Sequence, residues 1–160
     1  MRSKIIVRLV GLLLLAAAPA WSANLAPSTE ELVKALGNNG YEYQGMRGNK
    51  ATFTSKQSVV QVSLNDRGLI YEGGISIGPK ADVNATIVAL YTIYATLEVN
   101  KGRTRILNEK VALEKMIKLM DKAEAALKVS AKTQFRFENM EVLATRNDKT
   151  DYITIGLKPY

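Results

Sequence analysis

The sequence contains neither cysteine nor histidine. Without them there is no disulfide, no thiolate nucleophile and no imidazole base, which excludes the Ser-His-Asp and Cys-His catalytic systems. Most zinc, copper and iron sites need the same side chains. The phosphate-binding pattern G-x-x-x-x-G-K-[ST] and the dinucleotide-binding pattern G-x-G-x-x-G are also absent. We therefore expect a protein that is not an enzyme and that uses no cofactor and no metal.

Acidic residues are absent from the first 23 positions, which carry three basic ones. An apolar run from Leu9 to Ala18 follows the basic stretch, and small residues continue to Ala23. This layout is typical of a bacterial secretory signal peptide. The run is too short for a membrane-spanning helix, which needs roughly 20 apolar residues. We expect cleavage near Ser22 or Ala23, a periplasmic or secreted location, and a single domain over residues 24–160.

The charge excess is small once the predicted signal is removed. The whole chain has 22 basic and 15 acidic residues, so the loss of three basic residues leaves 19 against 15, a net charge of +4. This balance favours anionic neighbours but is too weak and too dispersed to predict nucleic-acid binding. No second long apolar run exists, so no transmembrane segment is expected in the mature chain.

The remaining sequence alternates between strand and helix patterns. Ser28 and Glu31 form a capping box at the start of a short helix, which the glycines after Leu36 end. Strands with period-two alternation are expected at 41–47, 50–54, 58–64 and 69–77. In the last of these, alternation places Leu69, Tyr71, Ile75 and Ile77 on one side, and Gly73-Gly74 predicts a bulge or a close backbone approach.

Two long helices are expected in the middle of the chain. The first runs from a cap at Asp82 to about Val99 and is apolar nearly all round, so we expect a central core helix. The second, within 104–128, is amphipathic, with a stripe of Ile106, Leu113, Met120 and Leu127. That stripe predicts packing on its own domain or, alternatively, a coiled-coil seam that forms a homodimer.

Three further strands are expected at 132–138, 140–146 and 150–157. Every strand-to-strand connection is short, so the strands pair antiparallel. The sequence therefore predicts an α+β fold in which a sheet of about seven strands packs on two long helices, in the order α-ββββ-αα-βββ. From Ser28 to Thr96 this element order resembles the small α+β fold of type III secretion chaperones and related sensory regulators. The resemblance implies dimerisation and binding of a partner.

Candidate contact residues come from tyrosine and arginine. Tyrosine combines a rigid apolar ring with a polar tip, so Tyr41 and Tyr43 fit either a packed sheet or a recognition surface. With Arg47 and Arg136 they are the predicted partner contacts on the sheet face that the helices leave uncovered. Lys101, Arg103 and Arg105, at the junction of the long helices, are predicted either to bind an anion or to form a solvated loop.

Three strand carboxylates, Glu42, Glu72 and Glu141, raise the alternatives of an acid and base pair or a solvated sheet face. Two of them in one cleft would favour an enzyme. The chemistry that is missing favours instead an exported, non-catalytic envelope protein that binds another macromolecule, of the inhibitor, immunity or assembly-factor type. The alternative is a periplasmic carrier of a small apolar or lipid-like ligand, held between the sheet and the apolar helix.

Overall fold

The computed structural model describes residues 29–103 and 109–160, which form three helices and one seven-stranded antiparallel sheet. The elements are α2 (Thr29–Gly37), β1 (Glu42–Arg47), β2 (Lys50–Ser55), β3 (Ser58–Leu64), β4 (Ile70–Ile77), α3 (Val83–Asn100), α4 (Glu109–Leu127), β5 (Lys132–Phe137), β6 (Met140–Asn147) and β7 (Tyr152–Pro159). The predicted α+β class and the order α-ββββ-αα-βββ are confirmed. The predicted helix cap at Ser28 lies outside the described residues.

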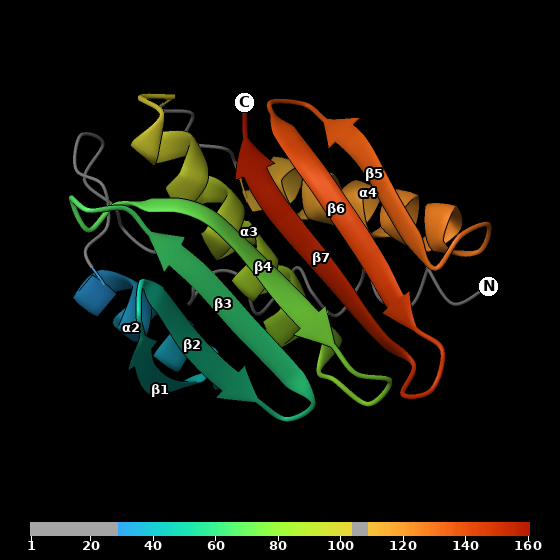
Figure 1. Ribbon diagram of the computed structural model, residues 1–160, viewed down its shortest axis with the longest axis horizontal. Coiled ribbons are helices and arrows are strands. Elements are labelled where there is room, and N and C mark those ends of the chain that lie inside the picture. Colours follow the sequence, from blue (N-terminus) through green and yellow to red (C-terminus); the bar gives the residue numbers. More distant parts are fainter. Residues whose placement is uncertain (1–28, 104–108) are drawn as a thin grey trace.

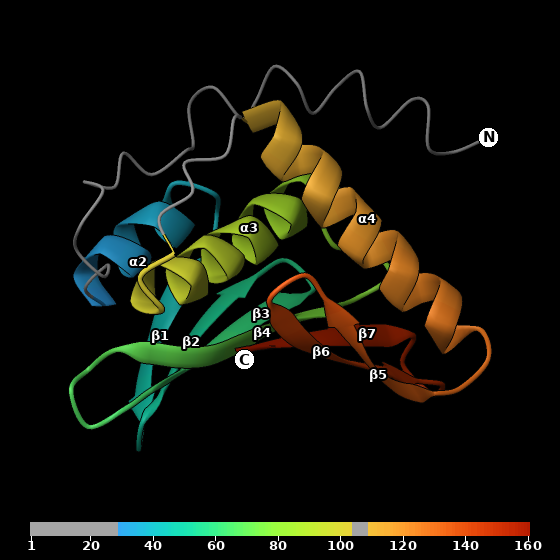
Figure 2. The ribbon, with the colours of Figure 1, turned by 90° about the horizontal axis from the view of Figure 1, so that it is seen from above.

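The sheet is built from two groups of strands. Its order is β1-β2-β3-β4-β7-β6-β5, so the last strand, β7, lies between β4 and β6 and joins the two groups. Figure 2 shows the three helices on one side of the sheet, and Figure 1 looks onto the other side, which none of them covers. We call this second side the open face. No helix in the described segments is long and apolar enough to cross a membrane.

Helix α3 lies in the middle of the helical layer, in contact with the sheet, α2 and α4. It begins at Asp82, whose carboxylate accepts a hydrogen bond of 2.9 Å from the backbone N–H of Ala85. Its side chains are buried on several sides because neighbours surround it, and Leu90, Ile93 and Leu97 are fully buried. The prediction of a central core helix is confirmed.

The apolar residues of helix α4 pack within the domain. Leu113, Met116, Leu119 and Leu127 all belong to the hydrophobic core. Ile106, the first member of the predicted stripe, lies outside the described residues. Because the described part of the stripe packs within the domain, it gives no support to a coiled-coil seam, and the homodimer stays a prediction.

The glycine pair on β4 marks a close approach, as the sequence predicts. A Cβ atom on Gly73 would lie 2.8 Å from Cγ2 of Ile93, so a side chain there would push α3 away from the sheet. A Cβ atom on Gly74 would lie 2.9 Å from the carbonyl oxygen of Ile155 on the neighbouring strand. Both glycines therefore allow β4 to pack tightly, one against α3 and one against β7.

The predicted facing of β4 is wrong at its start. Ile70, not Leu69, is buried in the core, and Tyr71 is exposed. The pairing with β3 explains the difference, because Leu64 pairs with Ile70 whereas Ser63 pairs with Glu72. Tyr71 is thus an extra residue, a β-bulge that reverses the alternation at this point.

Candidate functional site

The open face is organised in rows of side chains that cross the strands. Since alternate residues of a strand point to one face, cross-strand partners line up in a row perpendicular to the strands. The central row crosses all seven strands and holds Gly45, Thr52, Gln61, Gly74, Gly156, Leu143 and Gln134. We call it the glycine row, because Gly74 and Gly156 are paired at its centre and neither has a side chain.

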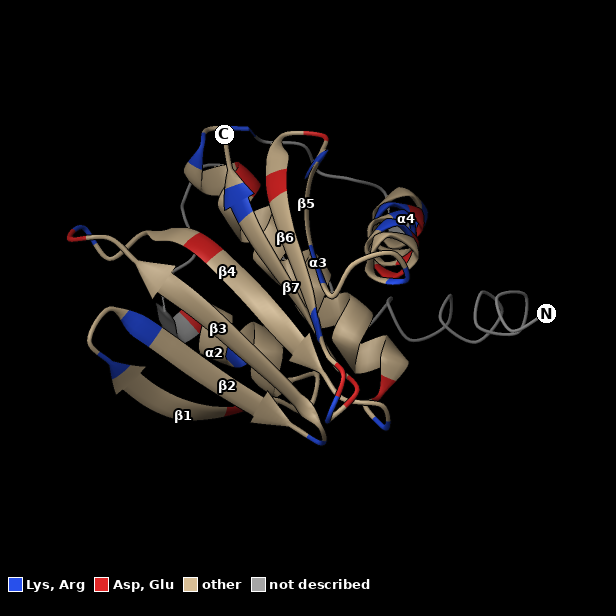
Figure 3. Cartoon of the chain, turned by 45° about the vertical axis from the view of Figure 1, so that its right-hand side comes forward, with Lys and Arg blue, Asp and Glu red and all other residues tan. Residues whose placement is uncertain are grey.

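The row on one side is charged. It contains Arg47, Lys50, Ser63, Glu72, Lys158, Glu141 and Arg136, and we call it the charged row. Four of its side chains are basic and two are acidic, which leaves an excess of two positive charges. Figure 3 shows basic and acidic bands on β1, β2, β4, β6 and β7 toward one end of these strands, while the strand centres carry none.

The row on the other side is mostly neutral. It contains Glu42, Thr54, Val59, Ser76, Thr154, Thr145 and Lys132, and we call it the hydroxyl row. The hydroxyl groups of Ser76 and Thr154 lie 2.8 Å apart and share a hydrogen bond. The open face therefore has a charged border on one side, a recessed centre at the two glycines, and a border that is rich in hydroxyl groups on the other side.

A hollow of about 380 Å³ lies on the open face where these rows cross the central strands. Its lining includes Gly74 and Gly156 as well as residues of both bordering rows, among them Lys50, Lys158 and Ser76. Ligand sites in proteins span roughly 300–1,000 Å³, so the hollow is at the small end of that range. Gly74 and Gly156, which have no side chains, lie paired within the depression.

The charged groups of the hollow are not equally engaged. Ser63 donates a hydrogen bond of 3.0 Å to Glu72, and the side-chain amide of Gln134 donates one to Glu141. The ammonium groups of Lys50 and Lys158 make no hydrogen bond or ion pair with any described residue. The hollow thus holds two ammonium groups without a partner among the described residues and two carboxylates that each accept a hydrogen bond from a neutral side chain.

Two of the four predicted partner contacts, Tyr41 and Tyr43, do not lie on the open face. Tyr41 is only 3% exposed, and its hydroxyl lies 2.8 Å from that of Ser58, so its prediction as a surface contact is wrong. Burial is the main cause that raises the pKa of Tyr41 above its ordinary value of 10.0. Tyr43 is partly exposed, but it pairs with the buried Phe53 and packs on that ring at 5.2 Å. It therefore lies on the helix side of the edge strand, not on the open face.

The two predicted arginine contacts do lie on the open face. Arg47 and Arg136 occupy opposite ends of the charged row, on the two edge strands β1 and β5. Arg136 also stacks over the ring of Tyr160, with 4.5 Å between its Cζ atom and the ring centroid, and donates a hydrogen bond of 3.0 Å to the backbone carbonyl of Glu138.

The predicted anion site is only partly described. Arg103 is held within the chain by Glu98, at 3.2 Å, and by the backbone oxygen of Tyr160, also at 3.2 Å. Lys101 is exposed next to it, at the end of α3, and Arg105 lies outside the described residues. Because the Arg103 guanidinium already binds two internal acceptors, the anion site stays a prediction without structural support.

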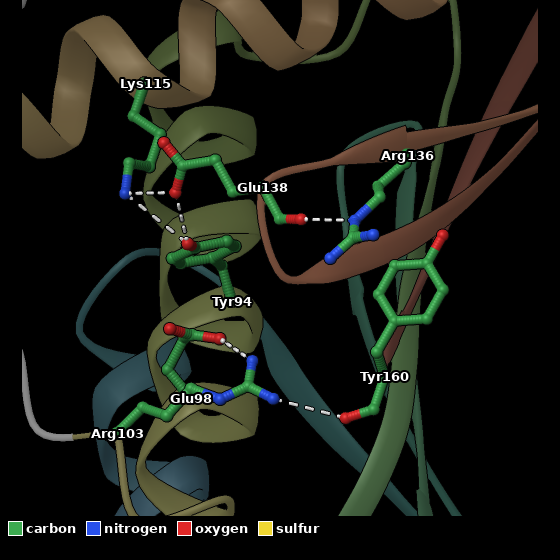
Figure 4. Close-up of polar contacts among 7 residues, drawn as sticks. All are labelled: Tyr94, Glu98, Arg103, Lys115, Arg136, Glu138 and Tyr160. Carbon is green, nitrogen blue, oxygen red and sulfur yellow. Dashed lines mark hydrogen bonds and ion pairs between the residues drawn. The ribbon is translucent and has the colours of Figure 1, made fainter.

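A second polar cluster joins helices α3 and α4 to the turn between β5 and β6 (Figure 4). Lys115 of α4 makes an ion pair of 2.6 Å with Glu138 in the turn between β5 and β6, and Tyr94 of α3 donates a hydrogen bond of 2.9 Å to the same carboxylate. Burial, then the hydrogen bond to Glu138, raises the pKa of Tyr94 far above its ordinary value of 10.0. We call these three residues the Lys115 cluster; its geometry is that of a structural clamp.

Two of the three candidate carboxylates meet at the hollow. Glu72 and Glu141 both line it, whereas Glu42 lies in the hydroxyl row outside it. An acid and base pair needs one carboxyl group that stays protonated, which an apolar pocket favours. Glu72 and Glu141 each accept a hydrogen bond from a neutral side chain, and they lie on β4 and β6 with β7 between them. No group of three or more acidic residues gathers as a candidate metal site in the described part of the chain.

Sequence reasoning missed the centre of the candidate site. Gln61, Gly156 and Lys158 come together only through the pairing of β4 with β7, whose residues are about 80 positions apart in the chain. The one local signal was Gly74, already singled out as part of a glycine pair.

The comparisons with known proteins give no assignment. No family model matches the chain, and neither does any curated protein or any solved structure. The resemblance to type III secretion chaperones therefore remains a prediction from element order.

Proposed function

We propose that this chain is an exported, non-catalytic bacterial envelope protein that binds another protein through its open face, as an inhibitor, immunity protein or assembly factor does. The observation that carries the proposal is the open face itself. A face of seven strands lies free of the described helices and is hollowed at its centre. It carries a graded arrangement of charge, and binding surfaces use such patterns for specificity.

A carrier of an apolar ligand is less well supported, for two reasons. The layer between helices and sheet is filled by side chains such as Phe53, Ile93 and Met116, all fully buried. The hollow on the open face has four charged side chains in its lining, Lys50, Glu72, Glu141 and Lys158. An apolar ligand placed there would leave the lysines and glutamates without water or partners, at a free-energy cost. We therefore keep the macromolecular partner as the proposal.

Export has a simple test, because the only tryptophan of the chain, Trp21, lies within the predicted signal peptide. We expect the protein purified from the periplasm of an exporting bacterial host to show no tryptophan emission and to have the mass of a chain cut after Ser22 or Ala23. The control is the same gene expressed from residue 24 in the cytoplasm. Retained tryptophan emission and an uncut mass would contradict the proposed export.

Two matched variants test the proposed binding of a partner. Leu143→Glu adds a negative charge to the open face at a side chain that is 40% exposed. Val111→Glu adds the same charge to α4, in the helical layer, at a side chain that is 46% exposed. Both variants should fold, since each site already meets solvent. Each is compared with the parent protein by cross-linking in the envelope fraction of the bacterium that carries the gene.

We expect the parent protein and Val111→Glu to cross-link the same partner protein in equal yield. Leu143→Glu should cross-link about tenfold less of this partner. Equal cross-linking by all three proteins would move the interface away from the open face. The absence of any repeated partner would remove the proposed function.

A further inference from the structure

We infer that the partner places an extended, acidic peptide segment across the strands of the open face, in the groove formed by the glycine row. This inference rests on the proposed function and adds the chemistry of the partner. Three features of the groove support it: its shape, its charged groups and the apolar side chain at its floor.

The shape of the groove fits an extended chain. The charged and hydroxyl rows are four residues apart along β2 to β7, for example at Glu72 and Ser76, so their backbones are separated by roughly 13 Å at about 3.3 Å per residue. Side chains of both rows project from these borders. A helix with its side chains is about 10–12 Å wide, so it would take up nearly the whole separation of the borders and leave little room for the side chains that project there. An extended chain is narrower and can approach the floor closely at Gly74 and Gly156.

The unpaired charges point to carboxylates on the partner. Lys50 and Lys158 line the hollow without any partner among the described residues, whereas Glu72 and Glu141 already accept hydrogen bonds. The two lysines and two glutamates of the hollow balance in charge, and the charged row gains its excess of two positive charges from Arg47 and Arg136 at its ends. An acidic segment would complete the ion pairs of both lysines, and a basic segment would meet an excess of like charge. The same excess disfavours a second copy of this chain, because two open faces would repel each other.

The floor of the groove selects one apolar side chain. Leu143 is exposed there beside Gly156, and a Cβ atom on Gly156 would still lie 3.7 Å from the nearest atom, the carbonyl oxygen of Leu143. A Cβ atom would therefore fit above Gly156 in ordinary van der Waals contact with Leu143. A valine or alanine of the partner segment can rest over the two glycines against Leu143, with its acidic neighbours directed to the lysines.

The test uses three synthetic peptides of about nine residues, the length that spans seven strands spaced about 4.8 Å apart. The first alternates glutamate with valine or alanine, and the others have glutamine or lysine in place of glutamate. Binding is followed by the backbone amide resonances of the mature protein. We expect the glutamate peptide to shift the signals of Gly74 and Gly156, and the glutamine and lysine peptides to bind at least about tenfold more weakly.

Charge-reversal variants make the test specific. Lys158→Glu should lower the affinity for the glutamate peptide about tenfold and raise the affinity for the lysine peptide. Lys50→Glu should change both affinities in the same directions. The control is Lys118→Glu, an exposed lysine on α4 in the helical layer, which should leave every affinity unchanged. Equal effects of Lys158→Glu and Lys118→Glu would overturn the inference, because net charge rather than the groove would then govern binding.

Other outcomes separate the inference from the proposed function. If no peptide binds but cross-linking to a partner still depends on Leu143, the open face binds a partner of different chemistry and only the inference fails. If the signals of Gly74 and Gly156 shift with protein concentration alone, a second copy occupies the groove and the inference is overturned. If neither peptides nor a partner bind, both proposals fail.

Discussion

At the scale of single residues, two paired glycines have different reasons for lacking a side chain. Gly74 is crowded by backbone, since its Cβ atom would meet the Ile155 carbonyl oxygen at 2.9 Å and the Cα atom of Gly156 at 3.1 Å. Gly156 has room, with nothing closer than 3.7 Å. Packing of the sheet therefore explains Gly74 but not Gly156, which leaves a role in shaping the hollow for Gly156.

This difference predicts opposite results for two matched substitutions. Gly74→Ala should lower the free energy of unfolding by about 1–3 kcal/mol, because backbone atoms cannot move aside easily. Gly156→Ala should leave it unchanged or raise it by about 0.4–1 kcal/mol, because alanine restricts the unfolded chain. Urea denaturation of both variants and the parent protein measures the effect. Equal destabilisation by the two alanines would contradict the assigned roles.

Prediction from the sequence was least accurate for the face of the sheet that a single side chain occupies. Alternation placed Tyr71 in the core, but a single extra residue at that point of β4 reverses the pattern and exposes it. Tyr41 was predicted either to pack or to contact a partner, and it packs: it lies just before β1, buried against Ser58. Tyr41 and Tyr43 share a face, but the sequence did not reveal that this is the face covered by the helices. A bulge shifts a period of two by one residue, and no local pattern in the sequence reveals that shift.

At the scale of elements, the sequence was far more informative. The apolar surface of α3 and the stripe of α4 predicted their burial, because these patterns extend over many residues and one error does not hide them. The contacts between elements were not predictable in this way. Lys115 belongs to the polar side of α4 in the sequence, but its side chain is only 11% exposed and reaches Glu138, 23 residues later, in a turn.

The Lys115 cluster joins α3, α4 and the β5–β6 turn, so we expect measurable coupling between its members. In a double-mutant cycle of Lys115→Met and Glu138→Gln, the coupling in the free energy of unfolding should be about 0.5–3 kcal/mol. The control cycle uses Arg146→Met and Asp148→Asn. That pair lies 2.8 Å apart with both side chains more exposed, so its coupling should stay below about 1 kcal/mol. A larger coupling in the control cycle would contradict the proposed clamp.

At the scale of the whole molecule, the sheet order determines where a binding surface can exist. The strands of the second group reach the first only through β7, which pairs with β4 and completes the glycine row. The sequence predicted seven antiparallel strands and their connections, but several sheet orders satisfy those facts. The candidate site depends on this one long-range pairing, which is why the sequence predicted the open face but not the groove within it.

The whole fold also responds to alkaline pH through two tyrosines held neutral by burial. Tyr41 and Tyr94 have raised pKa values in the folded chain, whereas in the unfolded chain both ionise near 10.0. The raised values contribute stability that is fully present below pH 10 and is lost as the pH rises toward the folded-state values, since only the unfolded chain then releases these protons. The free energy of unfolding should therefore fall above about pH 10, by up to about 1.4 kcal/mol per pH unit for each tyrosine.

Urea denaturation at several pH values on either side of 10 measures this loss. Tyr94→Phe removes one of the two groups, so the variant should start less stable because it lacks the hydrogen bond to Glu138, but its stability should then fall less steeply with pH. Tyr43→Phe is the matched control for removing a tyrosine hydroxyl, because this side chain is exposed at the edge strand and lies outside the Lys115 cluster. Identical slopes for the parent protein and Tyr94→Phe would mean that the Lys115 cluster opens before Tyr94 ionises, and that the clamp between helices and sheet is weaker than its geometry implies.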